Sequence, residues 1–536
     1  MKQMSVVKLS QQLKPTVLAL ALLMMPSLSS YAQATDTLSN TAVGAEKPAL
    51  AEHIRATAAA SLPAFNVPGM AVVAVHQGKV VLAEGFGIRD LESQLPVTKE
   101  TLFGVASHTK AFTAAALATL VDQGKVSWDD SVIKHLPEFK LADAHLSAQL
   151  TLRDLLSHRT GLGLGAGDLM IWPNTDKTTA DLLAGLAHVP IAHGLRERFD
   201  YNNLMFIVAG EVIARVSGMS YADYLAETFF KPLNMNNTHV GFSTIPANNT
   251  NFAVGTIEAQ GQLHRFALDY LEDFGAAGAI ASNAEDFAQW LLTLLNHGVS
   301  PAGEQLISER NVQAMWQVTT PLGVPPAAAA QGTHFRGYGL GWFIKNYHGV
   351  KHVSHSGGIL GMLSLTTLIP EHDFAITVIS NQQAFGALTA VTEEALELVL
   401  DLPDKDWVTS EQAKYDDMIQ AKAEFTLPAP STTRAALDLA SYSGTYRDAW
   451  YGDVNISVND DQLAISFAHT PMLQGQLEHY SGDTFVIRWH EPLLEADAFI
   501  DFSVNREQQV TGARLEAVAD FTDFSFDFHN LRLIRQ

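Results

Sequence analysis

The chain has 536 residues, 47% of them hydrophobic, which is enough for two to four domains of about 150 residues with sizeable cores. Its 57 acidic residues outnumber 34 Lys and Arg, and the net charge of −23 repels phosphate backbones and anionic lipid, which argues against nucleic-acid binding. Because the sequence contains no Cys, it excludes disulfides, thiolate nucleophiles, iron–sulfur clusters and cysteine-bearing zinc sites.

Residues 1–34 have the pattern of a signal peptide. Lysines precede an apolar stretch at 17–25, and Ala32-Gln33-Ala34 has the small-x-small pattern that signal peptidase cleaves. The apolar stretch is shorter than the roughly 20 residues that span a bilayer, which argues against a retained anchor. We predict cleavage after Ala34, a polar leader at 35–49, and a periplasmic or secreted protein without stable membrane insertion.

The elements that follow predict a sheet with helices around it. β-rich runs at 70–75 and 80–86 flank Gln77-Gly78, which has the chemistry of a hairpin turn. Strands at both ends of the segment, with helices between them, favour one antiparallel sheet built from both ends, flanked by helices, with a helical lobe and a crevice beside it. The other patterns predict helices at 110–123, 203–216, 284–295 and 388–400, and strands at 350–354, 363–369 and 374–380.

A change of composition divides the chain near residue 430. Residues 427–433 are rich in Pro, Ser and Thr, as linkers are, and short alternating runs follow at 453–458, 462–467 and 484–489. We therefore predict an α/β (α+β) domain at 50–405, a helix and linker at 406–434, and a separate all-β, barrel-like domain at 435–536.

Ser-x-x-Lys motifs offer a candidate nucleophile. A serine hydroxyl reacts when a base lies within hydrogen-bond reach, and a lysine three residues later shares its helical face. Three motifs begin at Ser5, Ser107 and Ser131, but Ser5 lies in the predicted signal peptide and Ser131 in a polar turn. Ser107 instead opens a helix that is apolar nearly all round, where burial would lower the pKa of Lys110. The alternative is a helix cap and a lysine that extends to solvent.

Two further groups carry candidate site residues. Tyr201-Asn202-Asn203 lies where a polar stretch enters a helix, and a phenol beside a cationic lysine would titrate low enough to act as a base. Its alternative is a turn in which an asparagine caps the helix. His355-Ser356-Gly357-Gly358 follows a predicted strand, and its glycines would let a substrate backbone approach closely. Its alternative is a polar turn with a bystander histidine, and His352 and His355 lack a third metal ligand in register.

Taken in order, Ser107-x-x-Lys110, Tyr201-x-Asn203 and His355-x-Gly357 resemble motifs of the serine β-lactamase and penicillin-binding-protein superfamily. The closest resemblance, over about residues 50–400, is to class C β-lactamase-related, S12-type serine hydrolases. It implies a serine β-lactamase-like transpeptidase fold that needs no metal or organic cofactor. It also implies acylation of Ser107, proton transfer by Lys110 and Tyr201, substrate contacts from Asn203, His355, Ser356 and Gly357, and an oxyanion hole formed by the N–H groups of Ser107 and Gly358.

One position departs from class C β-lactamases, which carry lysine where His355 stands. That lysine helps hold the substrate carboxylate, and histidine supplies less fixed charge near neutral pH. The change argues against efficient β-lactam hydrolysis and is similar to the D-amino-acid peptidase and esterase branches of the family. We interpret His158 as structural. The tail from Leu437 is similar to a lipocalin-like β-barrel, which would restrict access to the cleft or bind partners.

The first functional hypothesis is therefore an exported serine hydrolase that forms an acyl-enzyme with amide or ester substrates, including D-amino-acid-containing or peptidoglycan-like peptides. Alternatives are a β-lactamase, a non-catalytic penicillin-binding or sensor protein, and an adhesive protein whose motifs are accidental. Loops at 161–177 and 321–336 are expected to surround the cleft. Nothing in the sequence indicates an oligomeric state or a natural substrate.

Overall fold

The computed structural model describes residues 46–267, 271–330, 332–430, 435 and 437–536. The predicted signal peptide and its cleavage site lie outside these residues. Residues 47–536 form one contiguous unit. Among the described residues, no single helix is long and apolar enough to cross a membrane, and only the bent pair Leu204–Ser217 and Tyr221–Phe230 reaches that length and composition together.

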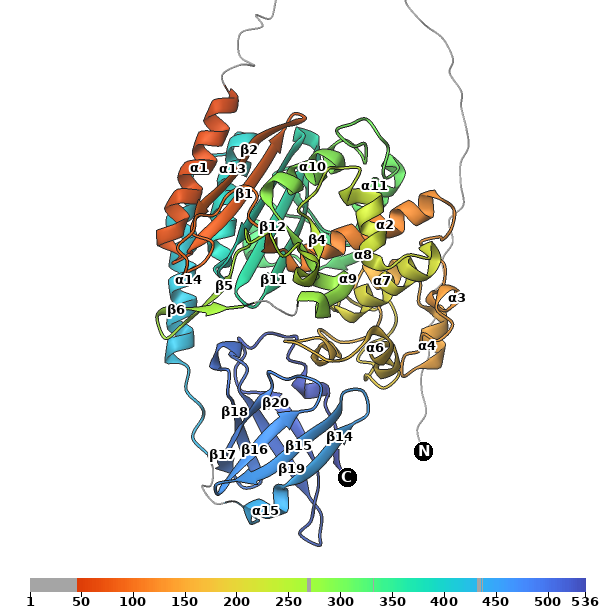
Figure 1. Cartoon of the computed structure of the whole chain (residues 1–536), viewed down its shortest axis with the longest axis vertical. Coiled ribbons are helices and arrows are strands. Elements are labelled where there is room, and N and C mark those ends of the chain that lie inside the picture. Colours follow the sequence, from red (N-terminus) through yellow and green to blue (C-terminus); the bar gives the residue numbers. More distant parts are fainter. Residues whose placement is uncertain (1–45, 268–270, 331, 431–434, 436) are drawn as a thin grey trace, which may run out of the picture. The chain divides into compact units, whose positions relative to one another are not determined.

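An antiparallel sheet of eight strands forms the centre of the first domain (Figure 1). Strand β1, near the start of the domain's sequence, pairs with β13, near its end. Met70 lies opposite Ser380, and His76 lies opposite Phe374. The prediction of one sheet built from both ends is confirmed. The strand order is β2 (Lys79–Gly87), β1 (Gly69–His76), β13 (Phe374–Ser380), β12 (Met362–Ile369), β11 (Val350–Ile359), β10 (Phe343–Tyr347), β9 (Arg336–Tyr338) and β8 (Thr320–Leu322).

Both faces of the sheet are covered by helices. Alternate residues of β1 enter two cores, so Val73 lies in one core together with residues of α2 (Thr109–Asp122) and α10 (Ala284–Leu295). Val72 enters the other core with α1 (Glu46–Ala64), α13 (Phe385–Leu400) and α14 (Trp407–Glu424). Because β1 is buried on both faces, its sequence is a continuous apolar run instead of an alternating one.

The helical lobe lies between β2 and β8 in the sequence. The helices predicted at 110–123, 203–216 and 284–295 correspond to α2, α7 and α10, and α7 ends at Gly218 with φ 75°. The lobe also contains α3 (Val132–His135), α4 (Ala144–Gln149), α5 (Leu152–Leu156), α6 (Thr179–Leu186), α7 (Leu204–Ser217), α8 (Tyr221–Leu225), α9 (Gly275–Gly278), α11 (Glu309–Met315) and α12 (Pro326–Ala330). Short strands there are β3 (Phe103–Gly104), β4 (His239–Val240), β5 (Gly255–Ala259), β6 (Gln262–Phe266) and β7 (Ile280–Ser282).

Two elements differ from the sequence-based prediction. Helix α1 begins at Glu46, inside the predicted leader, and its alanine-rich sequence has only a weak apolar stripe. Strand β11 continues beyond its predicted end at Ser354 to Ile359, so the His355–Gly358 motif lies within a strand and not in a turn. The turn follows the strand instead, where Gly361 has φ 83°.

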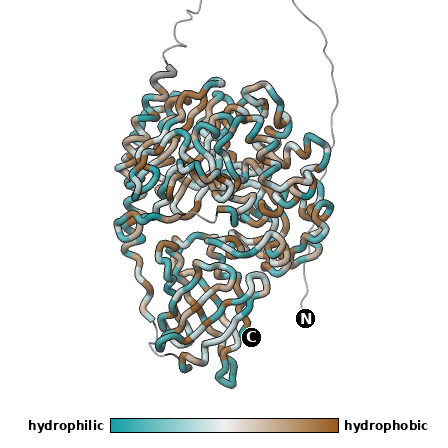
Figure 2. Tube along the Cα trace, viewed as in Figure 1, coloured by the Kyte–Doolittle hydropathy of each residue, from teal (hydrophilic) through white to brown (hydrophobic). Residues whose placement is uncertain are grey.

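The C-terminal domain is a closed barrel of eight antiparallel strands, which confirms the predicted barrel-like domain. Buried and exposed residues alternate along β17, and polar and apolar residues alternate along the barrel strands (Figure 2). Its elements are α15 (Leu439–Tyr442), β14 (Gly444–Asp448), β15 (Gly452–Asn459), β16 (Gln462–Phe467), β17 (Gln474–Ser481), β18 (Thr484–Trp489), β19 (Ala498–Val504), β20 (Val510–Ala517) and β21 (Leu533–Arg535).

Candidate active site

Ser107 lies in a 3₁₀ turn, η1 (Ala106–His108), that leads into the buried helix α2. The preceding residue, Ala106, has φ 50°, a left-handed conformation that costs a residue with a Cβ about 1–3 kcal/mol. Strand β12 holds this strained turn, because Ser364 Oγ donates to Val105 O at 2.9 Å and lies 2.8 Å from Nδ1 of His108. Burial lowers the pKa of His108 to about 3, so this imidazole is neutral.

Lys110 is fully buried and its amine contacts three oxygen atoms. Nζ lies 2.9 Å from Ser107 Oγ, 2.7 Å from Asn203 Oδ1 and 2.9 Å from Ala277 O. Burial lowers the pKa of Lys110 to about 7, against the opposing effect of the Asp168 carboxylate. Because Asn203 Oδ1 and Ala277 O can only accept, they take the two N–H bonds of the neutral amine. Its lone pair then faces the Ser107 hydroxyl, which is the arrangement that a general base requires.

Asp168 fixes the orientation of the Asn203 amide. Asn203 Nδ2 donates to Asp168 Oδ2 at 2.7 Å, which leaves Oδ1 facing Lys110. The sequence left open which asparagine caps the start of α7. The structure shows that it is Asn202, whose Oδ1 accepts from Met205 N at 3.3 Å. Burial raises the pKa of Asp168 to about 7, although hydrogen bonds from Asn203 and Ser525 oppose the shift. Asp168 therefore positions the amide that holds the lysine.

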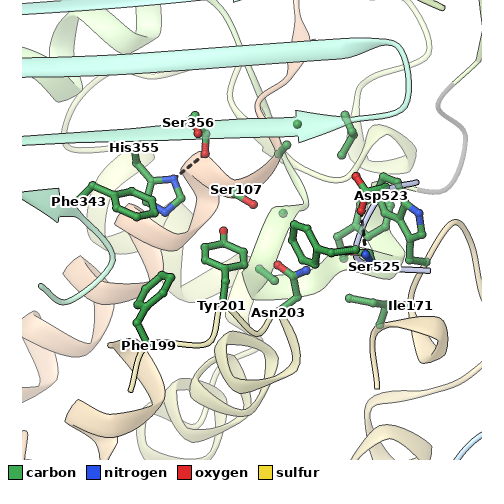
Figure 3. Close-up of a pocket in the computed structure, with 18 residues that line it drawn as sticks. Ser107, Ile171, Phe199, Tyr201, Asn203, Phe343, His355, Ser356, Asp523 and Ser525 are labelled. Carbon is green, nitrogen blue, oxygen red and sulfur yellow. Dashed lines mark hydrogen bonds between the residues drawn. The ribbon is translucent and has the colours of Figure 1, made fainter. Parts of the chain in front are cut away.

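Tyr201 completes the group around Ser107, with its phenol directed toward the serine (Figure 3). Lys110 Nζ lies 4.8 Å from the centroid of the Tyr201 ring. Burial raises the pKa of Tyr201 above its ordinary value, and a hydrogen bond with Ser107 only partly opposes this. The expectation that the phenol titrates low is therefore wrong, because the amine beside it loses its charge more readily than the phenol does. Tyr201 rests protonated.

His158 packs behind Tyr201, as the structural interpretation predicted. The ring centroids of the two residues are 4.1 Å apart, and His158 Nδ1 accepts from the backbone N–H of Asn202 at 3.1 Å. The histidine thus orients the Tyr201–Asn203 segment by accepting a hydrogen bond from a backbone N–H. A histidine that caps a helix end would instead donate to a backbone carbonyl. Burial and the charge of Lys110 hold the pKa of His158 well below its usual range.

His355 on β11 is a neutral residue in the structure. Its Nδ1 donates to Ser356 O at 2.6 Å, and its Nε2 accepts from the Tyr338 hydroxyl at 2.8 Å. Burial, together with the charge of Lys110, holds the pKa of His355 well below its usual range. This position therefore carries no fixed positive charge toward the cleft, and both ring nitrogens are engaged.

Gly357 and Gly358 offer a matched test of how tightly β11 packs on the nucleophile. A Cβ at Gly357 would lie 2.2 Å from Val105 O and 2.9 Å from Ser107 N, whereas at Gly358 the nearest atom is Leu363 Cδ2 at 3.2 Å. Gly357→Ala should therefore displace the nucleophile turn and reduce ester hydrolysis by about 100-fold, a loss that small misplacements of catalytic groups cause. Gly358→Ala should reduce it far less. Equal losses in steady-state assays of the two folded variants would contradict this.

The candidate residues meet at one cavity of about 350 Å³. Ser107, Tyr201, Asn203, Ser356 and Gly358 line it, with Lys110 beneath and Gly357 behind the nucleophile. The predicted loop at 161–177 contributes Ile171 and Trp172 to the lining. The loop at 321–336 is not part of the lining, and its ends belong to the edge strand β8 and the neighbouring strand β9. The remaining lining residues are Ala106, Phe199, Phe274, Ala277, Gly278, Phe343, His355, Ile359, Asp523, Phe524 and Ser525.

Sequence analysis missed the residues that reach this cavity from the C-terminal domain. Ser525 Oγ donates to Asp168 Oδ2 at 2.9 Å, and Phe524 packs edge-on against Tyr201 with centroids 5.9 Å apart. Asp168 was also missed, although it lies in the loop expected beside the cleft. No motif marks these residues, because their role depends on the packing of two domains.

Comparison with known proteins assigns both domains. The β-lactamase family model matches residues 51–400. The chain belongs to the β-lactamase family. A second match, to a domain of unknown function (DUF3471), covers residues 428–535 and so includes the barrel. The predicted limits at residues 405 and 435 stay predictions.

Relatives of this β-lactamase-family chain include hydrolases. Unguisins hydrolase ungD′ from Aspergillus campestris is 30% identical over 441 residues, which cover 75% of this chain and 77% of the relative. Protein flp from Staphylococcus aureus is 26% identical over 317 residues, which cover 59% of this chain and 60% of the relative.

Solved structures share the fold. The octameric penicillin-binding protein homologue from Pyrococcus abyssi has a TM-score of 0.57 at 23% identity, and the match covers 90% of this chain and 99% of that one. D-amino acid amidase from Ochrobactrum anthropi has a TM-score of 0.55 at 24% identity, and the match covers 66% of this chain and 98% of that one. These similarities confirm the fold predicted from the three motifs.

Proposed function

We propose that the protein is an exported serine hydrolase that forms an acyl-enzyme at Ser107 with amide or ester substrates, among them peptides that contain D-amino acids. The observation that carries the proposal is the contact of 2.9 Å between Lys110 Nζ and Ser107 Oγ in a site where burial lowers the pKa of the lysine to about 7, so that a large share of it is uncharged at neutral pH. A hydrolase relative at 30% identity supports it. Export rests on the signal-peptide pattern that ends at Ala34.

The geometry supports the following proton path. Neutral Lys110 takes the proton of Ser107 Oγ as that oxygen attacks the substrate carbonyl, and we expect the N–H groups of Ser107 and Gly358 to stabilise the oxyanion. The protonated phenol of Tyr201 then donates to the leaving amine or alcohol and recovers a proton from Lys110. In deacylation, water attacks the carbonyl of the acyl-enzyme and Lys110 again takes the proton. Tyr201 then protonates Ser107 Oγ, which leaves as the free hydroxyl, and Tyr201 recovers its proton from Lys110.

The neutral state of His355 argues against efficient β-lactam hydrolysis. In class C β-lactamases, which resemble this chain, a lysine at this position helps hold the substrate carboxylate. Here both ring nitrogens of His355 are occupied and the ring is uncharged. Penicillin should therefore acylate Ser107 more slowly than an uncharged ester does.

Intact-mass spectrometry with a fluorophosphonate probe tests the proposal. The purified protein should gain the mass of one phosphonyl group, peptide mapping should place it on Ser107, and Ser107→Ala should gain nothing. A parallel incubation with penicillin separates the alternatives: rapid turnover would indicate a β-lactamase, and a persistent adduct would indicate a penicillin-binding or sensor protein. Absence of any adduct on folded wild-type protein would refute the acyl-enzyme mechanism.

A further inference from the structure

A segment of the C-terminal domain between β20 and β21 forms one wall of the cavity. Ser525 donates to Asp168, and Asp527 Oδ2 accepts from the backbone N–H of Gly167 at 2.7 Å. Phe524 approaches the loop so closely that a Cβ at Gly165 would lie 2.6 Å from Phe524 O. Because these contacts hold the chain on the C-terminal side of Asp523, the Asp523 side chain has a defined place in the wall.

Asp523 presents a carboxylate to the cavity without a cationic partner. The side chain is exposed where it lines the cavity, and its Oδ1 accepts from Ser525 N at 2.8 Å (Figure 3). Among the described residues, no ion pair includes Asp523, and the cavity lining contains no lysine or arginine. Lys422, which lines a neighbouring cavity together with Asp523, is paired with Glu495 at 2.6 Å.

The rest of the lining suits the apolar part of an organic cation. Trp172 and Phe274 lie with ring centroids 5.5 Å apart, and both line the cavity together with Asp523. Aromatic faces attract ammonium groups, and a carboxylate beside them strengthens that attraction. The protein atoms around the accessible Asp523 carboxyl raise its pKa by desolvation, against the hydrogen bonds from Ser525, and a bound cation would oppose this shift.

The opposite side of the cavity adds no charge of its own. His355 is neutral, and Ser356 and Gly358 offer only uncharged groups. An anionic substrate would therefore meet one uncompensated carboxylate in a lining without lysine or arginine, and the nearby Lys110 loses most of its charge only above its pKa of about 7. A substrate with a free ammonium group would instead gain an ion pair.

We propose that Asp523 forms a subsite for a primary ammonium group, so that the barrel domain selects substrates with a free amine, such as amino-acid amides or esters and peptides with an unblocked N-terminus. This inference rests on the proposed function, because it takes the cavity beside Ser107 to be the substrate site. It assigns the barrel a specificity role inside the active site.

Competition against fluorophosphonate labelling tests the subsite with three ligands of similar size: 3-phenylpropylamine, 3-phenylpropan-1-ol and 3-phenylpropionate. At pH 8 the amine is protonated and the acid is ionised. The amine should protect Ser107 at a concentration at least tenfold below that of the acid, with the alcohol between them. A tenfold ratio corresponds to about 1.4 kcal/mol.

Variants assign the preference to one carboxylate. Asp523→Asn should raise the protecting concentration of the amine about tenfold, and Asp523→Lys should make the acid the better ligand. The matched control is Asp520→Asn, which changes an exposed carboxylate outside the cavity lining and should leave the preference within twofold of wild type. Thermal unfolding confirms that each variant is folded.

The outcomes separate the two proposals. Equal protection by the three ligands on wild type, or an amine preference that persists in Asp523→Asn, would overturn the subsite and leave the Ser107 mechanism standing. Failure of wild type to label would overturn the mechanism. In that case calorimetric titration with the same ligands would still decide the subsite, since binding of the amine does not require a reactive serine.

Discussion

Ser107→Ala is expected to hydrolyse p-nitrophenyl butyrate and amino-acid p-nitroanilides at least about 10⁴-fold more slowly than wild type, because loss of a nucleophile removes the covalent route altogether. The variant should fold normally. Ser107 Oγ is not needed to hold η1, since Ser364 and His108 make the contacts that fix this turn. Steady-state assays and thermal unfolding of the same preparation check both statements.

Ser131→Ala is the matched control. Ser131 also begins a Ser-x-x-Lys sequence, but its lysine, Lys134, is exposed and forms an ion pair with Asp130 at 2.7 Å. The amine of Lys134 is thus engaged by the Asp130 carboxylate instead of by the Ser131 hydroxyl. The Ser131→Ala rate should therefore stay within twofold of wild type. Residual activity in Ser107→Ala above a few per cent would instead place the nucleophile elsewhere.

The parts of the site that the sequence predicted are those in which local pattern and chemistry coincide. Ser107 and Lys110 stand at the start of a helix that is apolar nearly all round, and burial of that helix follows from its composition. Gly357 lies where β11 passes within contact of Val105. Each of these features depends on one element and its immediate packing, so a pattern in the sequence can reveal it.

The parts that the sequence did not predict depend on contacts between distant segments. Ser525 and Asp168 are 357 residues apart in the chain, and their hydrogen bond exists only because the barrel segment packs on the loop beside the cleft. The pKa of Tyr201 was misjudged for a related reason. A phenol next to a cationic lysine titrates low, but complete burial lowers the pKa of the lysine to about 7 and raises the pKa of the phenol, because it disfavours both charged forms.

The structure thereby gives the barrel a share in the catalytic network. Asp168 accepts from Ser525 on one side and from Asn203 on the other, and Asn203 accepts from Lys110. The chain of hydrogen bonds connects the barrel segment to the base through two side chains. The sequence left two roles open for the tail, restriction of access to the cleft and binding of partners. Because Asp523, Phe524 and Ser525 line the cavity, the structure favours the first.

Lys110→Met is expected to lower the rate of Ser107 phosphonylation by about 10³- to 10⁴-fold, the upper part of the range for loss of a general base. Methionine approximates the length and apolar stem of lysine, so the buried volume is largely kept. The substitution leaves Asn203 Oδ1 and Ala277 O without their donor, and a lower unfolding temperature is expected. Labelling rates by mass spectrometry on folded protein separate the chemical loss from the structural one.

The pH dependence of the labelling rate identifies the base independently of the rate loss in Lys110→Met. The reactive form of Lys110 is the neutral one, so the wild-type labelling rate should rise with pH through about 7 and reach a plateau above it. The Asp168 carboxylate raises the pKa of Lys110, and Asp168→Asn removes that charge, so the rise should move to lower pH. Lys134→Met, at the exposed motif, should leave the profile as in wild type. A wild-type profile that is flat between pH 6 and 8, or an Asp168→Asn profile that moves to higher pH, would show that a group other than Lys110 takes the proton from Ser107.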